Sequence, residues 1–221
     1  MNNKLLAMQQ LLRVVCVLAL MLPASVALAS TILQLDVDAL LEQAELVFEG
    51  EVIESSAFEK DANGAVHTRV VFRIDEIIAG AHSGSKLTLE FAGGQVHGKG
   101  MRVSGSILPA QGERGIYFVE SISRGLVNPL LGWSQGHFTL TRDSAGKERV
   151  LTNRSRPVKG IALTPQARDL RAPFSNGVAR GVRTGSAGEA AAAGMQSAEF
   201  KRQLRERLRE KAAQRNVRNP H

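Results

Sequence analysis

Short segments in which apolar and polar residues alternate set the strongest limit on how this chain of 221 residues folds. In Leu46–Val52, the residues at 46, 48 and 52 share one face while Glu49 and Glu51 lie on the other, which is the pattern of a half-buried strand. Gly50 falls on the inward side, where a glycine marks a bend or bulge and suggests closure of the sheet. The dipeptide Asn63-Gly64 then predicts an antiparallel hairpin. Further strand-like segments lie at 67–78, 86–91, 115–119, 138–140 and 149–151, with a shorter one at 101–103.

No helix long enough to connect parallel strands separates these segments, so the sequence predicts an all-β fold. Strands at this spacing are typical of a small antiparallel barrel (OB-like) or of a sandwich, here over residues 30–153. A short N-terminal helix over 39–44, capped by Asp38, precedes the first strand. We expect Leu40 and Leu41 of this helix to close one end of the core.

The first 29 residues have the pattern of a secretory signal peptide. Lys4 and Arg13 flank or enter an apolar run over 11–22, and Ala27-Leu28-Ala29 is a small-residue cleavage site, so cleavage is expected before Ser30. The alternative, an uncleaved membrane anchor, is disfavoured because the run is shorter than the ~20 residues of a spanning helix and contains Arg13. The sequence therefore predicts an exported protein, either periplasmic or secreted.

Cysteine usage narrows the chemistry further. The only cysteine, Cys16, lies within the apolar run, so the mature chain would contain none. Disulfides, thiolate nucleophiles and cysteine-ligated zinc are therefore excluded after cleavage.

Charge divides the chain into an acidic body and a basic tail. Residues 30–153 contain 11 basic and 16 acidic residues, whereas residues 154–221 contain 15 basic and 5 acidic residues. Prolines, glycines and scattered arginines over 154–194 predict a mostly disordered basic linker. Such asymmetry is typical of an interaction segment appended to a folded domain.

The last segment, 195–221, is predicted to form a basic amphipathic helix. Ser197 would cap it, and Phe200, Leu204 and Leu208 form a narrow apolar stripe. Its cations include Arg202, Arg205 and Arg209. This tail would bind an anionic surface or an acidic protein face, or fold back on the acidic body; nucleic acid is disfavoured because stacking aromatic residues are scarce.

The only match to a catalytic motif is Gly132-Trp133-Ser134-Gln135-Gly136, which reads as the nucleophile elbow of serine hydrolases. That elbow needs a following helix and a later histidine, but a strand pattern follows here and the only later histidine after His137 is His221. We therefore interpret Gly132 and Gly136 as shaping a turn and Trp133 as capping the core. A small serine hydrolase using Ser134 is kept as an alternative.

The remaining polar motifs favour a binding role over catalysis. The histidines at 67, 82, 97 and 137 lack the spacing of a zinc-binding helix and are interpreted as surface residues on outward strand positions. The carboxylate pairs Glu49 with Glu51 and Asp75 with Glu76 are interpreted as solvent-facing charges that confer solubility. Residues 93–100 are glycine-rich without phosphate-loop spacing, so we expect a flexible loop at a barrel mouth, where a partner would bind.

Several stretches resemble an uncharacterised group of exported bacterial proteins. The stretches are 44–52 with the hairpin after it, Ala92-Gly93-Gly94, 112–118 and 134–138. This resemblance implies a small barrel of the OB type, distantly similar to the netrin-like modules of tissue metalloprotease inhibitors. Those inhibitors chelate zinc with an N-terminal cysteine, which the expected mature start Ser30-Thr31 lacks, so no inhibitory residue is carried over.

The sequence as a whole predicts a non-enzymatic, exported binding protein that engages another envelope or secreted protein. No catalytic residue, metal ligand or cofactor is expected, and the sequence leaves the oligomeric state open. The alternatives are the serine hydrolase, an anionic-surface module using residues 154–221, and a metalloprotease-inhibitor-like protein. The candidate interaction residues are Gly94, His97, Lys99, Trp133, Arg202, Arg205 and Arg209.

Overall fold

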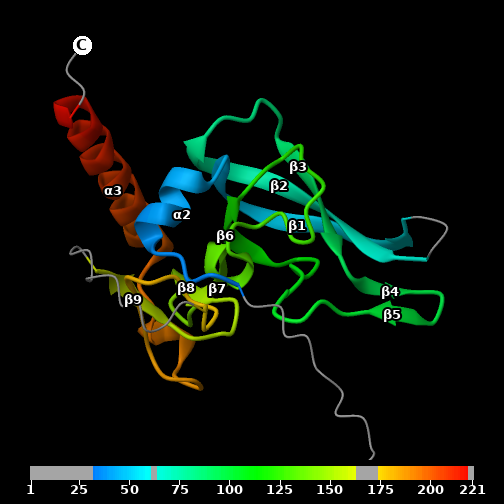
Figure 1. Ribbon diagram of the computed structural model, residues 1–221. Coiled ribbons are helices and arrows are strands. Elements are labelled where there is room, and N and C mark those ends of the chain that lie inside the picture. Colours follow the sequence, from blue (N-terminus) through cyan, green and yellow to red (C-terminus); the bar gives the residue numbers. More distant parts are fainter. Residues whose placement is uncertain (1–31, 61–63, 163–173, 219–221) are drawn as a thin grey trace, which may run out of the picture.

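The computed structural model describes residues 32–60, 64–162 and 174–218 (Figure 1). The predicted signal peptide, its cleavage site, Asn63 of the predicted turn and His221 lie outside these residues. No helix within the described ranges is long and apolar enough to cross a membrane.

Six antiparallel strands form one sheet in the order β3-β2-β1-β6-β7-β8. Their bounds are Leu46–Glu59 for β1, Val66–Gly80 for β2, Lys86–Ala92 for β3, Arg114–Val119 for β6, His137–Arg142 for β7 and Glu148–Thr152 for β8. Each of the six main strand-like segments in the sequence is a strand, so the antiparallel, predominantly β architecture is confirmed.

The long strands β1 and β2 bend where their register shifts. One shift lies between Glu49 and Gly50, as the inward glycine predicts. A Cβ at Gly50 would lie 2.3 Å from the Arg73 carbonyl oxygen, so only glycine lets the two strands approach this closely. The bend leaves the first half of β1 paired with both β2 and β6, while its second half continues with β2 alone as a two-stranded arm.

The described strands do not close into a barrel. β3 and β8 are the two edges of the sheet, and the outer side of β8 is occupied by other segments. Val150 N–H donates to Met195 O at 3.0 Å, and Leu151 forms a bridge with Pro157. These segments satisfy the β8 edge locally, so the expectation of closure around the inward glycine is not met.

The sheet is covered on both faces. One core includes Phe48, Phe72, Phe91 and Tyr117, and the other includes Val47, Phe118 and Phe138. The second core is completed by α2 (Val37–Gln43), which buries Leu40 and Leu41 as predicted.

The N-cap of α2 is Asp36, which accepts from Ala39 N at 2.7 Å, and not the predicted Asp38. Asp38 lies in the first turn instead, next to Arg207.

The predicted linker differs from the structure over its described parts, 154–162 and 174–194. β9 (Val158–Ile161) pairs with β10 (Val182–Thr184), a 3-10 turn forms at Ala191–Ala193, and Val158, Ile161 and Ala179 are buried in the second core. Backbone pairing with the N-terminal segment, such as Arg180 N to Leu35 O at 2.8 Å, holds this stretch in place. The folded unit therefore continues past Asn153, because scattered apolar residues bury well once distant backbone completes their hydrogen bonds.

The C-terminal helix α3 (Ser197–Arg218) packs against this second core. Phe200 and Leu204 of the predicted stripe are buried, and the ring centroids of Phe200 and Phe138 are 5.0 Å apart. Ser197 lies within the helix, and its hydroxyl donates to Glu49 at 3.3 Å instead of acting as the predicted cap. Folding back on the body, one of the options that the sequence left open for the tail, is the arrangement found (Figure 1).

If α3 is part of the folded core, Phe200→Ala should destabilise the whole protein. Removing a buried phenylalanine costs about 3–5 kcal/mol, so the urea midpoint of Trp133 fluorescence should fall substantially. Arg209→Ala, an exposed position on the same helix, should shift the free energy of unfolding by less than about 0.5 kcal/mol. Equal midpoints for Phe200→Ala and the parent chain would show that α3 does not contribute to the core.

Candidate functional site

A small hairpin, β4 (Gly94–Val96) and β5 (Lys99–Met101), projects from the end of β3 beside the two-stranded arm (Figure 1). Gly93 and Gly94 have φ values of 104° and 135°, and they turn the chain sharply out of β3. The hairpin loop is His97-Gly98, with φ values of 48° and 78°. Positive φ at both loop positions is typical of the type I′ turn of a two-residue hairpin, so the glycine-rich stretch forms a hairpin where the sequence predicted a flexible loop.

The hairpin borders a hollow of about 690 Å³, which falls within the size range of ligand-binding sites. Its lining residues are Ala92, Gly93, Gly94, Gln95, Gly100, Met101, Arg102, Val103, Ser106, Ile107 and Leu108. Apolar and glycine residues predominate, and Arg102 is the one charged residue among them. Residues 93–100, for which the sequence predicted a binding role, therefore border a concave, mainly apolar surface.

The three candidate residues of this segment have different positions. Gly94 lines the hollow, and a Cβ there would lie 2.4 Å from Thr68 Oγ1. His97 is at the hairpin tip, and Lys99 forms an ion pair with Glu59 at 3.0 Å. Neither His97 nor Lys99 belongs to the lining of the hollow. Sequence reasoning missed Arg102, Ile107 and Leu108, because nothing in their local pattern marks them as neighbours of the hairpin.

The motif around Ser134 forms a 3-10 turn, Trp133–Gly136, followed directly by β7. Gly132 has φ 60°, so it shapes the turn as predicted. Gln135 is fully buried, and its amide clamps the N-terminal segment by accepting from Leu35 N at 2.8 Å and donating to Leu33 O at 2.9 Å. Trp133 is partly buried, and its ring lies 3.8 Å from the position of a Cβ on Gly105. The motif therefore holds the N-terminal segment in place, and Trp133 lies beside Gly105, which precedes Ser106 of the hollow.

Ser134 has no hydrogen-bonded histidine within the described ranges. The residue is 7% exposed, and its hydroxyl oxygen lies 3.5 Å from the position of a Cβ on Gly177. His137, the nearest histidine in the sequence, is hydrogen-bonded to Glu113 instead. A serine without a general base in contact lacks the means to lose its proton during attack.

His137 corrects the interpretation of the histidines as surface residues, since it is only 1% exposed. Its Nε2 lies 2.6 Å from Glu113 Oε1, and the Tyr117 hydroxyl donates to the same oxygen at 3.0 Å. Burial, reinforced by the negative charge of Glu113, raises the pKa of Tyr117. His137, Tyr117 and Glu113 thus join β7, β6 and the loop before β6 through hydrogen bonds inside the apolar core. The alternation that places residue 137 on a strand face does not reveal that this face is covered.

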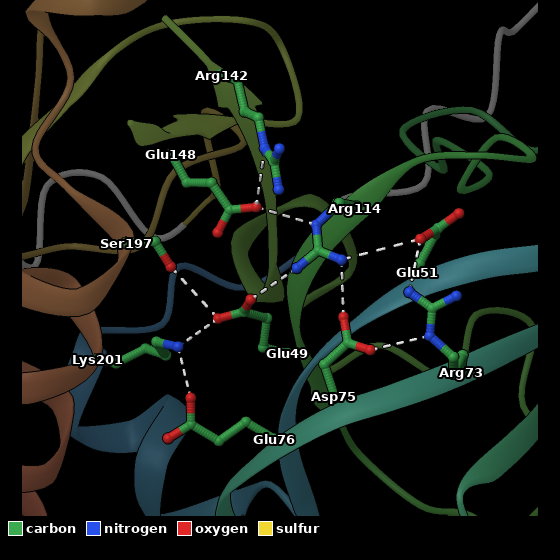
Figure 2. Close-up of polar contacts among 10 residues, drawn as sticks. All are labelled: Glu49, Glu51, Arg73, Asp75, Glu76, Arg114, Arg142, Glu148, Ser197 and Lys201. Atoms are coloured by element: carbon green, nitrogen blue, oxygen red, sulfur yellow. Dashed lines mark hydrogen bonds and ion pairs between the residues drawn. The ribbon is translucent and has the colours of Figure 1, made fainter. Parts of the chain in front are cut away.

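The carboxylates near β1 correct a second interpretation, because they form a network and not a solvated face (Figure 2). Glu49 is 5% exposed and accepts from Arg114 at 3.0 Å. Arg114 also contacts Asp75 at 2.8 Å and Glu148 at 3.1 Å, so it joins β6 to β2 and β8. Lys201 of α3 lies between Glu49 and Glu76, which anchors the helix to the same network.

Most cations on the inner side of α3 are paired with the body. Arg205 contacts Glu76, Arg207 contacts Asp38, and Lys211 contacts Glu42. Arg202 pairs with Glu199 and Glu206 of its own helix, and Arg209 is exposed. Of the three predicted tail residues, Arg205 therefore belongs to an intramolecular contact, whereas Arg202 and Arg209 face outward.

These pairs shift the pKa of the groups involved. Burial disfavours the charged form of Glu76, but hydrogen bonds from Lys201 and Arg205 outweigh it and hold its pKa below the ordinary value. The pKa of Lys201 is raised in turn, since its bonds to Glu49 and Glu76 outweigh the cost of burial. Both shifts favour the charged, docked state of the helix.

Comparisons with protein-family models, with curated proteins and with solved structures found no match. The expected mature start Ser30-Thr31, which corresponds to the zinc-chelating start of the metalloprotease inhibitors but lacks their cysteine, lies outside the described residues. The residues within the described ranges contain no cluster of three or more histidine, cysteine, aspartate or glutamate side chains suited to a metal ion.

Because no histidine among the described residues is hydrogen-bonded to Ser134, we expect a fluorophosphonate probe to leave the folded protein unlabelled. Labelling measured by in-gel fluorescence should match that of Ser134→Ala and of a heat-denatured sample. A signal that appears only in the folded parent chain and disappears in Ser134→Ala would establish the hydrolase alternative.

The lowered pKa of Glu76 predicts a pH-dependent contribution to stability. As the pH falls, the unfolded chain takes up this proton first, so the stabilisation is complete above the ordinary value of 4.5 and is lost progressively below it. Glu76→Gln should cost about 1 kcal/mol at pH 7, since the pairs are partly exposed, and the difference from the parent chain should shrink toward pH 3.5. Glu54→Gln, an exposed β1 carboxylate, should show neither effect. Parallel stability curves for Glu76→Gln and the parent chain in urea titrations would contradict this assignment.

Proposed function

We propose that this protein is a non-enzymatic, exported binding protein that engages another envelope or secreted protein through the hollow beside the β4–β5 hairpin. The observation that carries the proposal is the hollow itself, which is about 690 Å³ in volume, lies beside a projecting hairpin and is lined mainly by apolar and glycine residues. Exposed apolar surface of this kind is typical of interaction sites.

The distribution of charge supports the hairpin over the tail as the binding element. Lys201, Arg205 and Lys211 are occupied by Glu49, Glu76 and Glu42 of the body, which leaves fewer cations of α3 for an anionic surface. The hollow has no such internal occupant among the described residues, and Ile107 on its wall is 36% exposed.

We also propose that the open sheet is a partly open barrel of the OB type. β1 bends at Gly50 and pairs with β2 on one side and β6 on the other, which supports this finer assignment. Barrels of this type bind ligands with their loops and one sheet face, and the β4–β5 hairpin is such a connection between β3 and β6.

Site-specific photo-crosslinking tests the binding role. A photoreactive residue at position 107 should yield a discrete crosslinked product with one protein of the envelope or medium of the source cell, identified by mass spectrometry. The same residue at Ile77, which is also an isoleucine with 36% exposure but lies on β2, is the matched control. Met101→Asp, which places a charge in the hollow, should reduce the product at position 107 at least tenfold.

The crosslinking experiment has a clear negative outcome. Absence of a discrete product at position 107, or the same product at both positions, would contradict binding at the hollow.

A further inference from the structure

The hollow has three properties that together specify a ligand, and the first is an unpaired strand edge. β5 pairs with β4 alone in the described part of the chain, in the register Val96 with Lys99, Gln95 with Gly100 and Gly94 with Met101. In a two-residue hairpin, the residues next to the turn exchange hydrogen bonds, and alternate residues then direct their main-chain groups away from the partner. The N–H and C=O of Gly100 therefore face outward from the hairpin.

The space beside this edge is open. Gly100 lines the hollow, so its main chain borders open space. No heavy atom lies within 4 Å of the position that a Cβ on Gly100 would take, so the face of the hairpin at this residue is also clear. An extended chain can therefore reach the β5 main chain. Strand addition of this kind derives its affinity from main-chain hydrogen bonds.

The second property is a cation without an acidic partner. Arg102 is exposed, and none of the ion pairs found among the described residues includes it. Nearby cations differ in this respect, since Lys99 pairs with Glu59 and Lys60 pairs with Glu90. A guanidinium in this state suits a planar anion such as a carboxylate, which it binds through two parallel hydrogen bonds.

The third property is the apolar wall next to Arg102. Met101, Val103, Ile107 and Leu108 lie along the hollow, whose volume is large enough for a few apolar side chains. Arg102 is the only charge in this lining, so a ligand that matches the hollow is anionic at one end and apolar next to that end.

We propose that the hollow binds the free C-terminus of an extended peptide. The peptide main chain adds to the edge of β5 at Gly100, its terminal carboxylate binds Arg102, and its last apolar side chains pack against Ile107 and Leu108. This inference rests on the proposed binding function and names the chemistry of the partner. A fatty acid would satisfy Arg102 and the apolar wall but would leave the outward main-chain groups of Gly100 unused.

Peptide arrays test this recognition directly. The probes are octapeptides with a flexible polar start and one of Ala, Val, Leu, Ile or Phe at each of the last two positions, prepared as free acids and as C-terminal amides. Binding of the full chain is measured by fluorescence anisotropy with the strongest members of the array. We expect free acids to bind at least tenfold more tightly than the matching amides.

Two variants of similar chemistry separate the role of Arg102 from general charge. Arg102→Gln should weaken binding of the free acid at least tenfold and leave binding of the amide unchanged. Lys99→Gln, which removes a neighbouring cation outside the hollow, should change binding less than twofold. Ile107→Ser should weaken both forms of the peptide, and circular dichroism of each variant checks that the fold is retained.

The possible failures are distinguishable from those of the binding role. If the crosslink at position 107 forms but free acids show no advantage over amides, or Arg102→Gln binds like the parent chain, the C-terminus proposal is wrong while the binding function stands. Complete displacement of the peptides by decanoate at equal concentration would assign the hollow to a fatty acid and overturn the proposal. Absence of both the crosslink and any peptide binding would reject the two together.

Discussion

The buried carboxylate of Glu49 is the group on which the arrangement of this protein depends. A charged side chain shielded from water is costly unless it is paired and hydrogen-bonded. Glu49 meets this requirement with Arg114 of β6 and with Lys201 and Ser197 of α3 (Figure 2). Satisfying one carboxylate therefore joins the central strands to the C-terminal helix, and Arg114 extends the connection to β2 and β8 through Asp75 and Glu148.

This pairing also determines which charges are available to a partner. The acidic body takes up much of the basic charge of α3, so the division of the sequence into an acidic and a basic half describes two surfaces of one folded unit. The β4–β5 hairpin lies apart from this network and is supported by the arm, where Gly93 N donates to Val66 O at 2.8 Å and Thr68 Oγ1 donates to Gly93 O at 2.7 Å. Its hollow and Arg102 are left to face outward, which is the basis of the functional proposal.

Particular residues show how far local patterns reach. The alternation in Leu46–Val52 correctly predicted a strand and a bulge at Gly50, yet it placed Glu49 in solvent. Alternation in the later strand, where Phe138 and Leu140 face inward, placed His137 on an exposed face, although it is buried beside Glu113 and Tyr117. Both errors have one cause: a period of two separates the faces of a strand but does not say whether the second face is covered.

The sequence by itself determined where the six strands of the main sheet, the short helix and the C-terminal helix lie, because periodicity and turn preferences act between residues close together in the chain. It also singled out the glycine-rich stretch at 93–100 as a candidate binding segment. Tertiary structure alone decided that Val158–Ile161 joins the core, that α3 docks on the sheet and that Arg102, Ile107 and Leu108 border one hollow. These outcomes depend on contacts between residues far apart in the chain. Burial of apolar side chains and pairing of charges across such distances do not produce a periodic pattern in any one segment of the sequence.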